Sequence, residues 1–178
     1  FSDIATPTAT GKFNAYDEIK KELTARGIRT EEIAFVHDAK NDKQKQELFE
    51  KVQNGTIRVL IGSTQKMGAG TNAQRRLVAL HHADCPWRPS DLQQREGRIV
   101  RQGNMNREVE IYNYVTKGTF DSYLWQIVEN KQRFISQIMN NSTTARIFED
   151  TDTTVLNHAE VKAVAMDDPL IRRKMELE

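Results

Sequence analysis

The chain has few of the features that mark secreted, membrane or disulfide-stabilised proteins. Its 178 residues include one cysteine, which excludes a disulfide framework and fits a reducing compartment. No run of about 18 apolar residues is present, and no signal-peptide pattern opens the chain. The net charge is +1, so any surface that binds nucleic acid must be a local patch. We therefore expect a cytoplasmic protein without a membrane partner.

Internal repeats and low-complexity segments are also missing, and the length allows one domain plus an appendage. The chain begins with Phe1 rather than methionine and ends within a helical pattern. We interpret it as a fragment of a larger protein.

Short apolar runs alternate with helical patterns over the first two thirds of the chain. The runs predict buried strands at residues 33–36, 59–62 and 77–80 and a last strand at 109–115, and residues 1–4 fit the end of a further strand. Helical spacing is found at 14–26, at 42–53 and from 90. Uninterrupted apolar strands between helices predict an α/β fold, with a parallel sheet and helices on both faces.

The pattern changes after Gly118. A long helix is predicted over 120–140, followed by a polar break, a helix over 154–166 and another that opens at Asp168-Pro169. We therefore divide the chain into an α/β domain at 1–118 and an all-helical extension at 119–178.

The stretch 91–103, "DLQQREGRIVRQG", is rich in arginine and is predicted to be one helix. A helical wheel, advancing about 100° per residue, places Leu92 and Ile99 toward a core. Gln94, Arg98 and Arg101 then share a polar face that carries no glutamate. A solvated helix more often pairs such residues with glutamate, so an anion from outside the helix is the expected partner.

Residues 63–72, "STQKMGAGTN", follow a predicted strand and combine small polar residues with glycines. A loop of this kind exposes backbone N–H groups to phosphates, as binding to a sugar-phosphate strand requires. The alternative is an ordinary glycine-rich connection.

Four motifs in a fixed order carry a family resemblance. They are "STQKMGAGTN", "CPWRPSDLQQ" at 85–94, "QREGRIVR" at 94–101 and "VTKGTFD" at 115–121. The first resembles helicase motif V and the third matches the Q-R-x-G-R-x-x-R pattern of motif VI. The second resembles the Trp-Asn-Pro segment of the Swi/Snf group, with Arg88 where asparagine is usual. Over roughly residues 1–140 the chain resembles the second RecA-like lobe of a superfamily 2 helicase of the Swi/Snf type.

The resemblance implies a role for each motif residue. Arg98 and Arg101 would be arginine fingers that reach the γ-phosphate of ATP, with Gln94 orienting the phosphate or the fingers; the alternative is a surface helix with fortuitous arginines. The residues implied in nucleotide binding are Gly68, Gly70, Asn72 and Arg95. Those implied in contacts with the DNA backbone are Ser63, Thr64 and Lys66. Trp87 either stacks on a base or packs in a rigid turn.

Half of the ATPase site is missing from this sequence. "TPTATGKF" at 6–13 contains Gly11-Lys12, but no glycine stands five residues earlier, and Phe13 replaces the Ser or Thr that would contact magnesium. The resemblance therefore implies that ATP and Mg²⁺ are bound mainly by an upstream RecA-like lobe. This chain alone is expected to be inactive.

The implied function is that of a motor lobe in an ATP-dependent DNA helicase or translocase, and Swi/Snf likeness favours duplex DNA. The rival is a non-catalytic nucleic-acid- or protein-binding module that retained the fold. The tail "AEVKAVAMDDPLIRRKMELE" also resembles the helicase section of very large phage and mobile-element proteins that add an adenine methyltransferase. "HHADC" at 81–85 lacks the ligand spacing of a zinc site, so we expect a strand end and no metal.

Overall fold

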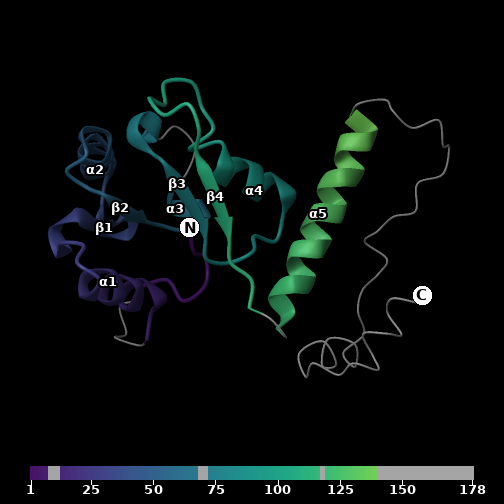
Figure 1. Cartoon of the computed structure of the whole chain (residues 1–178), viewed down its shortest axis with the longest axis horizontal. Helices are drawn as coiled ribbons and strands as arrows, with labels where there is room; N and C mark the ends of the chain where they lie inside the picture. Colours follow the sequence, from purple (N-terminus) through teal and green to yellow (C-terminus); the bar gives the residue numbers. More distant parts are fainter. Residues whose placement is uncertain (8–12, 68–71, 117–118, 140–178) are drawn as a thin grey trace. The chain divides into compact units, whose positions relative to one another are not determined.

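The computed structural model describes residues 1–7, 13–67, 72–116 and 119–139. The chain forms two compact units. Unit 1 contains Phe1–Asp84 and Ser90–Tyr114, and unit 2 contains Cys85–Pro89 and the chain from Val115 onward. Figure 1 labels the helices and strands.

Helices and strands alternate along the described part of unit 1. The helices are α1 (Ala15–Ala25), α2 (Asp42–Asn54), α3 (Thr64–Met67) and α4 (Pro89–Glu96), with 3₁₀ turns η1 (Thr30–Glu32), η2 (Val36–Asp38) and η3 (Gln74–Arg76). The strands are β1 (Ile33–Phe35), β2 (Val59–Ile61), β3 (Ala79–His82) and β4 (Glu110–Asn113). Each predicted strand from residue 33 onward is present, although β3 begins two residues later than its apolar run.

All strand pairs are parallel, as predicted. β1 pairs with β2, and β3 pairs with β4. Phe1 and Ser2 lie between the two pairs: the Ser2 N–H donates to the Gly62 carbonyl at 3.2 Å, and the Ala83 N–H donates to the Phe1 carbonyl at 2.9 Å. Residues 1–2 therefore bridge β2 and β3, in the way expected of a strand end, without forming a regular strand themselves.

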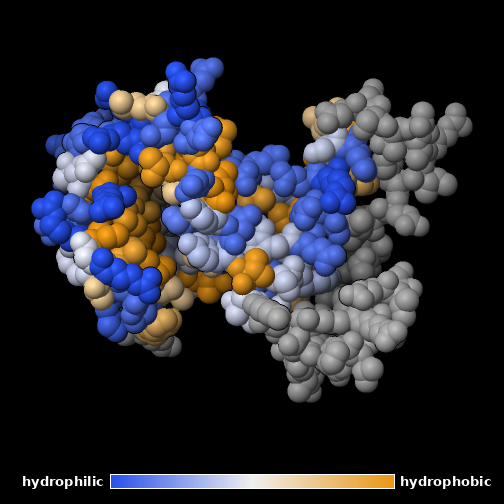
Figure 2. Space-filling view, in the orientation of Figure 1, coloured by the Kyte–Doolittle hydropathy of each residue, from blue (hydrophilic) through white to orange (hydrophobic). Residues whose placement is uncertain are grey.

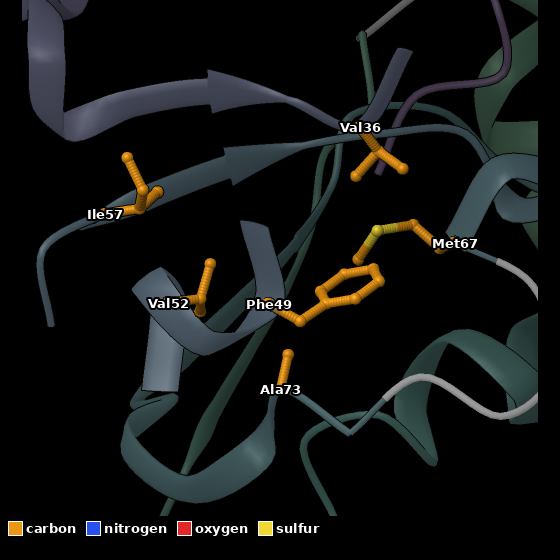
Figure 3. Packing of buried hydrophobic residues seen from close by; sticks show 6 residues of the cluster. All are labelled: Val36, Phe49, Val52, Ile57, Met67 and Ala73. Atoms are coloured by element: carbon orange, nitrogen blue, oxygen red, sulfur yellow. The ribbon is translucent and has the colours of Figure 1, made fainter. Parts of the chain in front are cut away.

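Helices α1 and α2 cover opposite faces of β1 and β2. Successive side chains of a strand point to opposite faces, so Ile33 and Phe35 belong to one face and Ala34 to the other. The first pair packs with Tyr16 of α1. The second face packs with Phe49 of α2, within a cluster drawn in Figure 3. On the face in Figure 2, apolar surface is visible in the body of unit 1 and hydrophilic residues surround it. The arrangement is the α/β layering of a RecA-like lobe.

Polar caps define the ends of the two longer helices of unit 1. The Asn14 side chain accepts a hydrogen bond from the Asp17 N–H, and the Asn41 side chain accepts one from the Gln44 N–H. Such N-caps satisfy amides that have no partner within the helix. Gly55 ends α2 in the left-handed conformation, with φ of 85°.

The predicted helix over 91–103 is wrong beyond Glu96, where α4 ends. After that residue the backbone tightens, because the Arg98 and Ile99 amides donate to the carbonyls of Arg95 and Glu96, three residues back. The Asn104 side chain then donates to the Ile99 carbonyl at 3.1 Å. The helical wheel therefore does not apply to the arginines at 98 and 101.

Unit 2 contains the long helix α5 (Phe120–Met139), which confirms the prediction over its described length. The Thr119 hydroxyl accepts a hydrogen bond from the Asp121 N–H at its start. Val128 is the buried residue of this helix. The helices predicted at 154–166 and from 168 lie outside the described residues. Among the residues described, no helix is long and apolar enough to cross a membrane.

Candidate functional site

Polar residues from three segments meet where the parallel strands of unit 1 end. Asp3 follows the bridging residues Phe1 and Ser2, Thr64 follows β2, and Asp84 follows β3. The carboxyl ends of parallel strands lie at one edge of a sheet, which is where ligands bind in open α/β folds. The local sequence explains the placement, since Thr64 and Asp84 come within three residues of the ends of β2 and β3, and Asp3 directly follows the bridging residues.

Arg95 of α4 lies at the centre of this edge and is completely buried, with 0% of its surface exposed. Its Nε donates to Thr64 Oγ1 at 2.7 Å. Nη2 donates to Asp3 Oδ2 at 2.8 Å and to Asp84 Oδ1 at 2.9 Å. Nη1 donates to the Asp84 carbonyl at 3.0 Å and lies 3.4 Å from His82 Nδ1. A guanidinium has five N–H donors, so every donor of Arg95 faces an acceptor.

Thr64 is held by Asp3 as well as by Arg95. The Thr64 N–H donates to Asp3 Oδ1 at 2.6 Å, and the Thr64 hydroxyl donates to Asp3 Oδ2 at 2.7 Å. The hydroxyl thus gives its one proton to Asp3 while it accepts a bond from Arg95. Both polar groups that Thr64 could offer as donors are engaged within the lobe.

Asp84 holds the segment at the start of the chain. Its Oδ2 accepts hydrogen bonds from the Asp3 and Ile4 amides and from the Ser2 hydroxyl, the last at 3.2 Å. Its other oxygen faces Arg95. Because Asp84 is buried, these donors compensate a carboxylate that has lost its water.

The electrostatics of the edge follow from burial and from this pairing. Burial alone raises the pKa of Asp3, but the hydrogen bonds from Thr64 and Arg95 outweigh it and the pKa is lowered. Burial lowers the pKa of His82 to about 4, and the positive charge of Arg95 adds to the effect. Asp3 is therefore ionised at neutral pH, and the His82 ring beside the guanidinium is neutral.

Arg98 and Arg101 lie in the turns after α4. Arg98 is half-buried, and its pKa is lowered first by burial and then by the charge of Arg101. The two arginines are therefore near enough to interact, although no helix face aligns them. Gln94 is exposed on α4 itself. A Cβ at Gly97 would lie 3.0 Å from the Gln93 carbonyl, so the backbone of Gly97 lies close to the last turn of α4.

The predicted DNA-contacting segment forms the short helix α3 where it is described. Ser63 is buried, and its hydroxyl accepts a hydrogen bond from the Lys66 N–H at 3.2 Å. Lys66 is exposed, so its ammonium is the accessible group of the three predicted contacts. Asn72 is exposed and its carbonyl accepts a hydrogen bond from the Gln53 side chain. Gly68 and Gly70 lie outside the described residues.

Trp87 and the histidines near it have distinct surroundings. Trp87, in unit 2, is 75% exposed rather than packed in a turn, and its stacking on a base stays a prediction. In unit 1, His82 faces Arg95, whereas the His81 ring stacks on Tyr112 with the centroids 4.9 Å apart. Among the described residues, no group of three or more His, Cys, Asp or Glu side chains could hold a metal ion.

The roles of Asp3 and Asp84 were not predicted from the sequence, and Arg95 was predicted to contact the nucleotide. The rule that polar residues after strands meet at one edge could have indicated both aspartates. Nothing local indicated their common partner, because Asp3 and Arg95 are 92 residues apart. A nucleotide contact by Arg95 stays a prediction. The structure does not favour it, because all five N–H donors of Arg95 already face acceptors within the protein.

The fold and this edge define the chain as a parallel α/β lobe with an arginine-rich segment after its fourth helix. The helicase conserved C-terminal domain model matches residues 9–103, which is more than half of the chain. The chain belongs to this family, and it is a Swi/Snf-like C-terminal lobe of a superfamily 2 helicase.

Three relatives illustrate the similarity. The chain is 33% identical over 89 residues to defense against restriction protein B of Escherichia phage P1, covering 50% of this chain and 4% of the relative. It is 34% identical over 95 residues to the uncharacterized ATP-dependent helicase YqhH of Bacillus subtilis, covering 53% and 16%. It is 29% identical over 106 residues to the SWI/SNF-related matrix-associated actin-dependent regulator of chromatin subfamily A-like protein 1 of Xenopus tropicalis, covering 60% and 11%. The chain thus spans a small part of each relative's length.

Proposed function

We propose that the chain is the C-terminal motor lobe of an ATP-dependent DNA helicase or translocase, in which it supplies arginine fingers and contacts to the DNA backbone. The observation that carries the proposal is the family match over residues 9–103, which contains the arginine segment. Two relatives are named for ATP-dependent helicase or SWI/SNF-related proteins, in agreement with this role.

Arg98 and Arg101 are the residues proposed to act on ATP, with Gln94 beside them on α4. A guanidinium suits this chemistry because its planar fork grips two phosphate oxygens and does not deprotonate. Charge that develops on the transferred phosphoryl group would be stabilised by the two cations. Burial lowers the pKa of Arg98 and the charge of Arg101 adds to the effect, and an anion placed between the two side chains would relieve the repulsion between them.

The nucleotide itself would be held mainly by an upstream RecA-like lobe. That lobe would supply the P-loop and the ligands of Mg²⁺, while Gly68, Gly70 and Asn72 of this chain would border the nucleotide. We expect this chain alone to bind ATP weakly and to hydrolyse none.

DNA would be bound through its phosphates at the edge where β2 ends. Lys66 supports this assignment, because its ammonium is exposed next to the network that fixes Thr64. Ser63 and Thr64 would contribute through the position of the α3 backbone, and Trp87 would stack on a base. Closing of the two lobes around ATP, repeated in each cycle, would move the strand in small steps along duplex DNA.

The cellular setting proposed is the cytoplasm of a bacterium, with the protein bacterial or phage-encoded. The similarity to a phage P1 protein supports this setting. The tail that resembles helicase–methyltransferase proteins further suggests a fused adenine methyltransferase as a partner domain.

The test is the ATPase rate of a protein that joins this lobe to its upstream lobe, measured with and without duplex DNA. We expect hydrolysis that DNA stimulates, and none from the 178-residue chain by itself. Binding of DNA without any ATP hydrolysis by the two-lobe protein would favour the non-catalytic module instead.

A further inference from the structure

The buried network at the carboxyl edge connects two segments that the proposed function treats separately. Thr64 lies in the segment proposed to contact DNA, and Arg95 lies three residues before Arg98, the first of the proposed fingers. We propose that Asp3, Asp84 and Arg95 are positioning residues, which hold Thr64 in a fixed geometry relative to the arginine segment. This inference rests on the proposed function and assigns a coupling role to residues outside it.

Arg95 has no N–H donor left for a ligand. Its five N–H groups face Thr64, Asp3, two oxygens of Asp84 and the His82 ring. Its side chain is also completely buried. A residue that contacted phosphate would need at least one guanidinium edge open toward the ligand. The geometry therefore assigns Arg95 to the framework of the site.

Thr64 and Arg95 each lie close in sequence to a residue with a proposed function. The Arg98 amide donates to the Arg95 carbonyl at 3.1 Å, so the finger segment begins within one turn of the network. On the other side, α3 begins at Thr64 and Lys66 lies two residues further on. A shift of Thr64 would therefore be passed to Arg95 through a single side-chain hydrogen bond.

Asp3 binds both partners of the hydrogen bond between Thr64 and Arg95. One of its oxygens accepts the Thr64 amide, while the other accepts the Thr64 hydroxyl and Arg95 Nη2. Asp84 holds the Asp3 amide in turn. Each donor of this network is bound to an acceptor of the protein, and none is directed at a ligand. The network therefore holds the segments at fixed distances rather than binding a substrate. Charged hydrogen bonds of this kind are the strong ones.

The test uses the protein that contains both lobes, with substitutions that preserve shape. Asp3→Asn removes the charge, and Thr64→Val removes the hydroxyl, whereas Thr64→Ser keeps it. Asp42→Asn, on the exposed first turn of α2, is the control. The quantities measured are kcat and KM for ATP at saturating duplex DNA, kcat without DNA, DNA affinity and melting temperature.

We expect Asp3→Asn and Thr64→Val to lower kcat at saturating DNA on the order of ten- to a hundredfold, as small misplacements of reacting groups do. KM for ATP should stay close to that of the wild type, and Thr64→Ser should restore most of the turnover. Should Asp3→Asn fail to fold, the comparison of Thr64→Val with Thr64→Ser decides the matter alone.

Unchanged kcat in both variants, measured well below their melting temperatures, would overturn the positioning role. So would a loss of turnover in Thr64→Val that is present at low DNA concentration and disappears at saturating DNA, because Thr64 would then act as a direct DNA contact. Absence of DNA-stimulated hydrolysis in the wild-type protein would instead remove the proposed function, and the inference with it. The wild-type rate thus distinguishes the two failures.

Discussion

Arg95 Nε donates a 2.7 Å hydrogen bond to Thr64 Oγ1, across 31 residues of sequence. The bond joins helix α4 to the end of β2 at the carboxyl edge of the sheet. Asp3 accepts hydrogen bonds from both residues, so three segments are fixed at one point. The stability of unit 1 should depend on this point more than on any exposed ion pair.

Replacing Arg95 with methionine should destabilise unit 1 by about 3–5 kcal/mol, because it leaves buried Asp84 without its charge partner. Arg133→Met is the matched control. Arg133 pairs with Glu129 on α5 with both side chains more than half exposed, so its loss should cost less than about 1 kcal/mol. Urea denaturation measures both. Equal effects of the two substitutions would show that the Arg95 network carries no special share of the stability.

The stability of unit 1 should fall as the pH is lowered from about 6.5 toward 4. The pKa of His82 is about 4 in the folded chain and 6.5 as its ordinary value, so the unfolded chain takes up a proton first. Linkage then destabilises the fold over this interval by an amount on the order of 3 kcal/mol. Burial is the largest cause of the lowered pKa, and the charge of Arg95 adds to it.

The His82→Gln variant should lose much of this pH dependence, which thermal melting at pH 7 and pH 5 measures. His81→Gln is the comparison, because that ring is exposed. Partial burial nevertheless lowers the pKa of His81, so the His81→Gln variant should lose a smaller part of the pH dependence of stability. If the melting temperature of His82→Gln falls between pH 7 and pH 5 as much as that of the wild type, other groups cause the acid sensitivity.

Gly55 should tolerate alanine less well than Gly27 does. Both have positive φ, 85° and 96°, and alanine in this region costs about 1–2 kcal/mol. At Gly27 an added Cβ would meet nothing within 4 Å, whereas at Gly55 it would lie 2.8 Å from the Arg76 guanidinium. That guanidinium donates a hydrogen bond to the Asn54 carbonyl. Displacing it should cost about 1 kcal/mol more. Equal melting temperatures of the two alanine variants would contradict this.

Lys66→Ala should weaken DNA binding to the same extent for all sequences, because the contact is proposed to be with phosphate. The slope of log affinity against log salt should decrease by about 0.9, as expected for one lost phosphate contact. Lys21→Ala, whose ammonium pairs with Glu18 on α1, is the control and should leave the slope unchanged. A loss that depends on DNA sequence would indicate base readout instead.

The sequence predicted those parts of the fold that depend on local pattern. The apolar run at 33–36 and the helical spacing from Asn14 were sufficient to predict β1 and α1. The end of α4 was missed because Arg98 and Arg101 fit a helical wheel, although Gly97 after Glu96 was an available stop signal.

The site at the carboxyl edge was predictable only in part. Motif order singled out Thr64 and Arg95, which both belong to this edge, since a motif is a local property; their predicted contacts with DNA and nucleotide stay predictions. The network around Arg95 depends on tertiary contacts over 31 and 92 residues, and no local periodicity reports such contacts. Asp3 could therefore be recognised only once the sheet had placed it beside Thr64.

The measurement that tests the proposed motor function most directly is the steady-state ATPase rate of the two-lobe protein carrying Arg98→Lys or Arg101→Lys, beside its ATP affinity. Lysine keeps the charge but loses the bidentate fork, so we expect turnover to fall on the order of 10³- to 10⁵-fold, as for other arginine fingers. ATP affinity should fall far less, because the fingers act in the transition state. Turnover that stays above about a tenth of the wild-type rate in both variants, well short of a finger's contribution, would contradict the assignment.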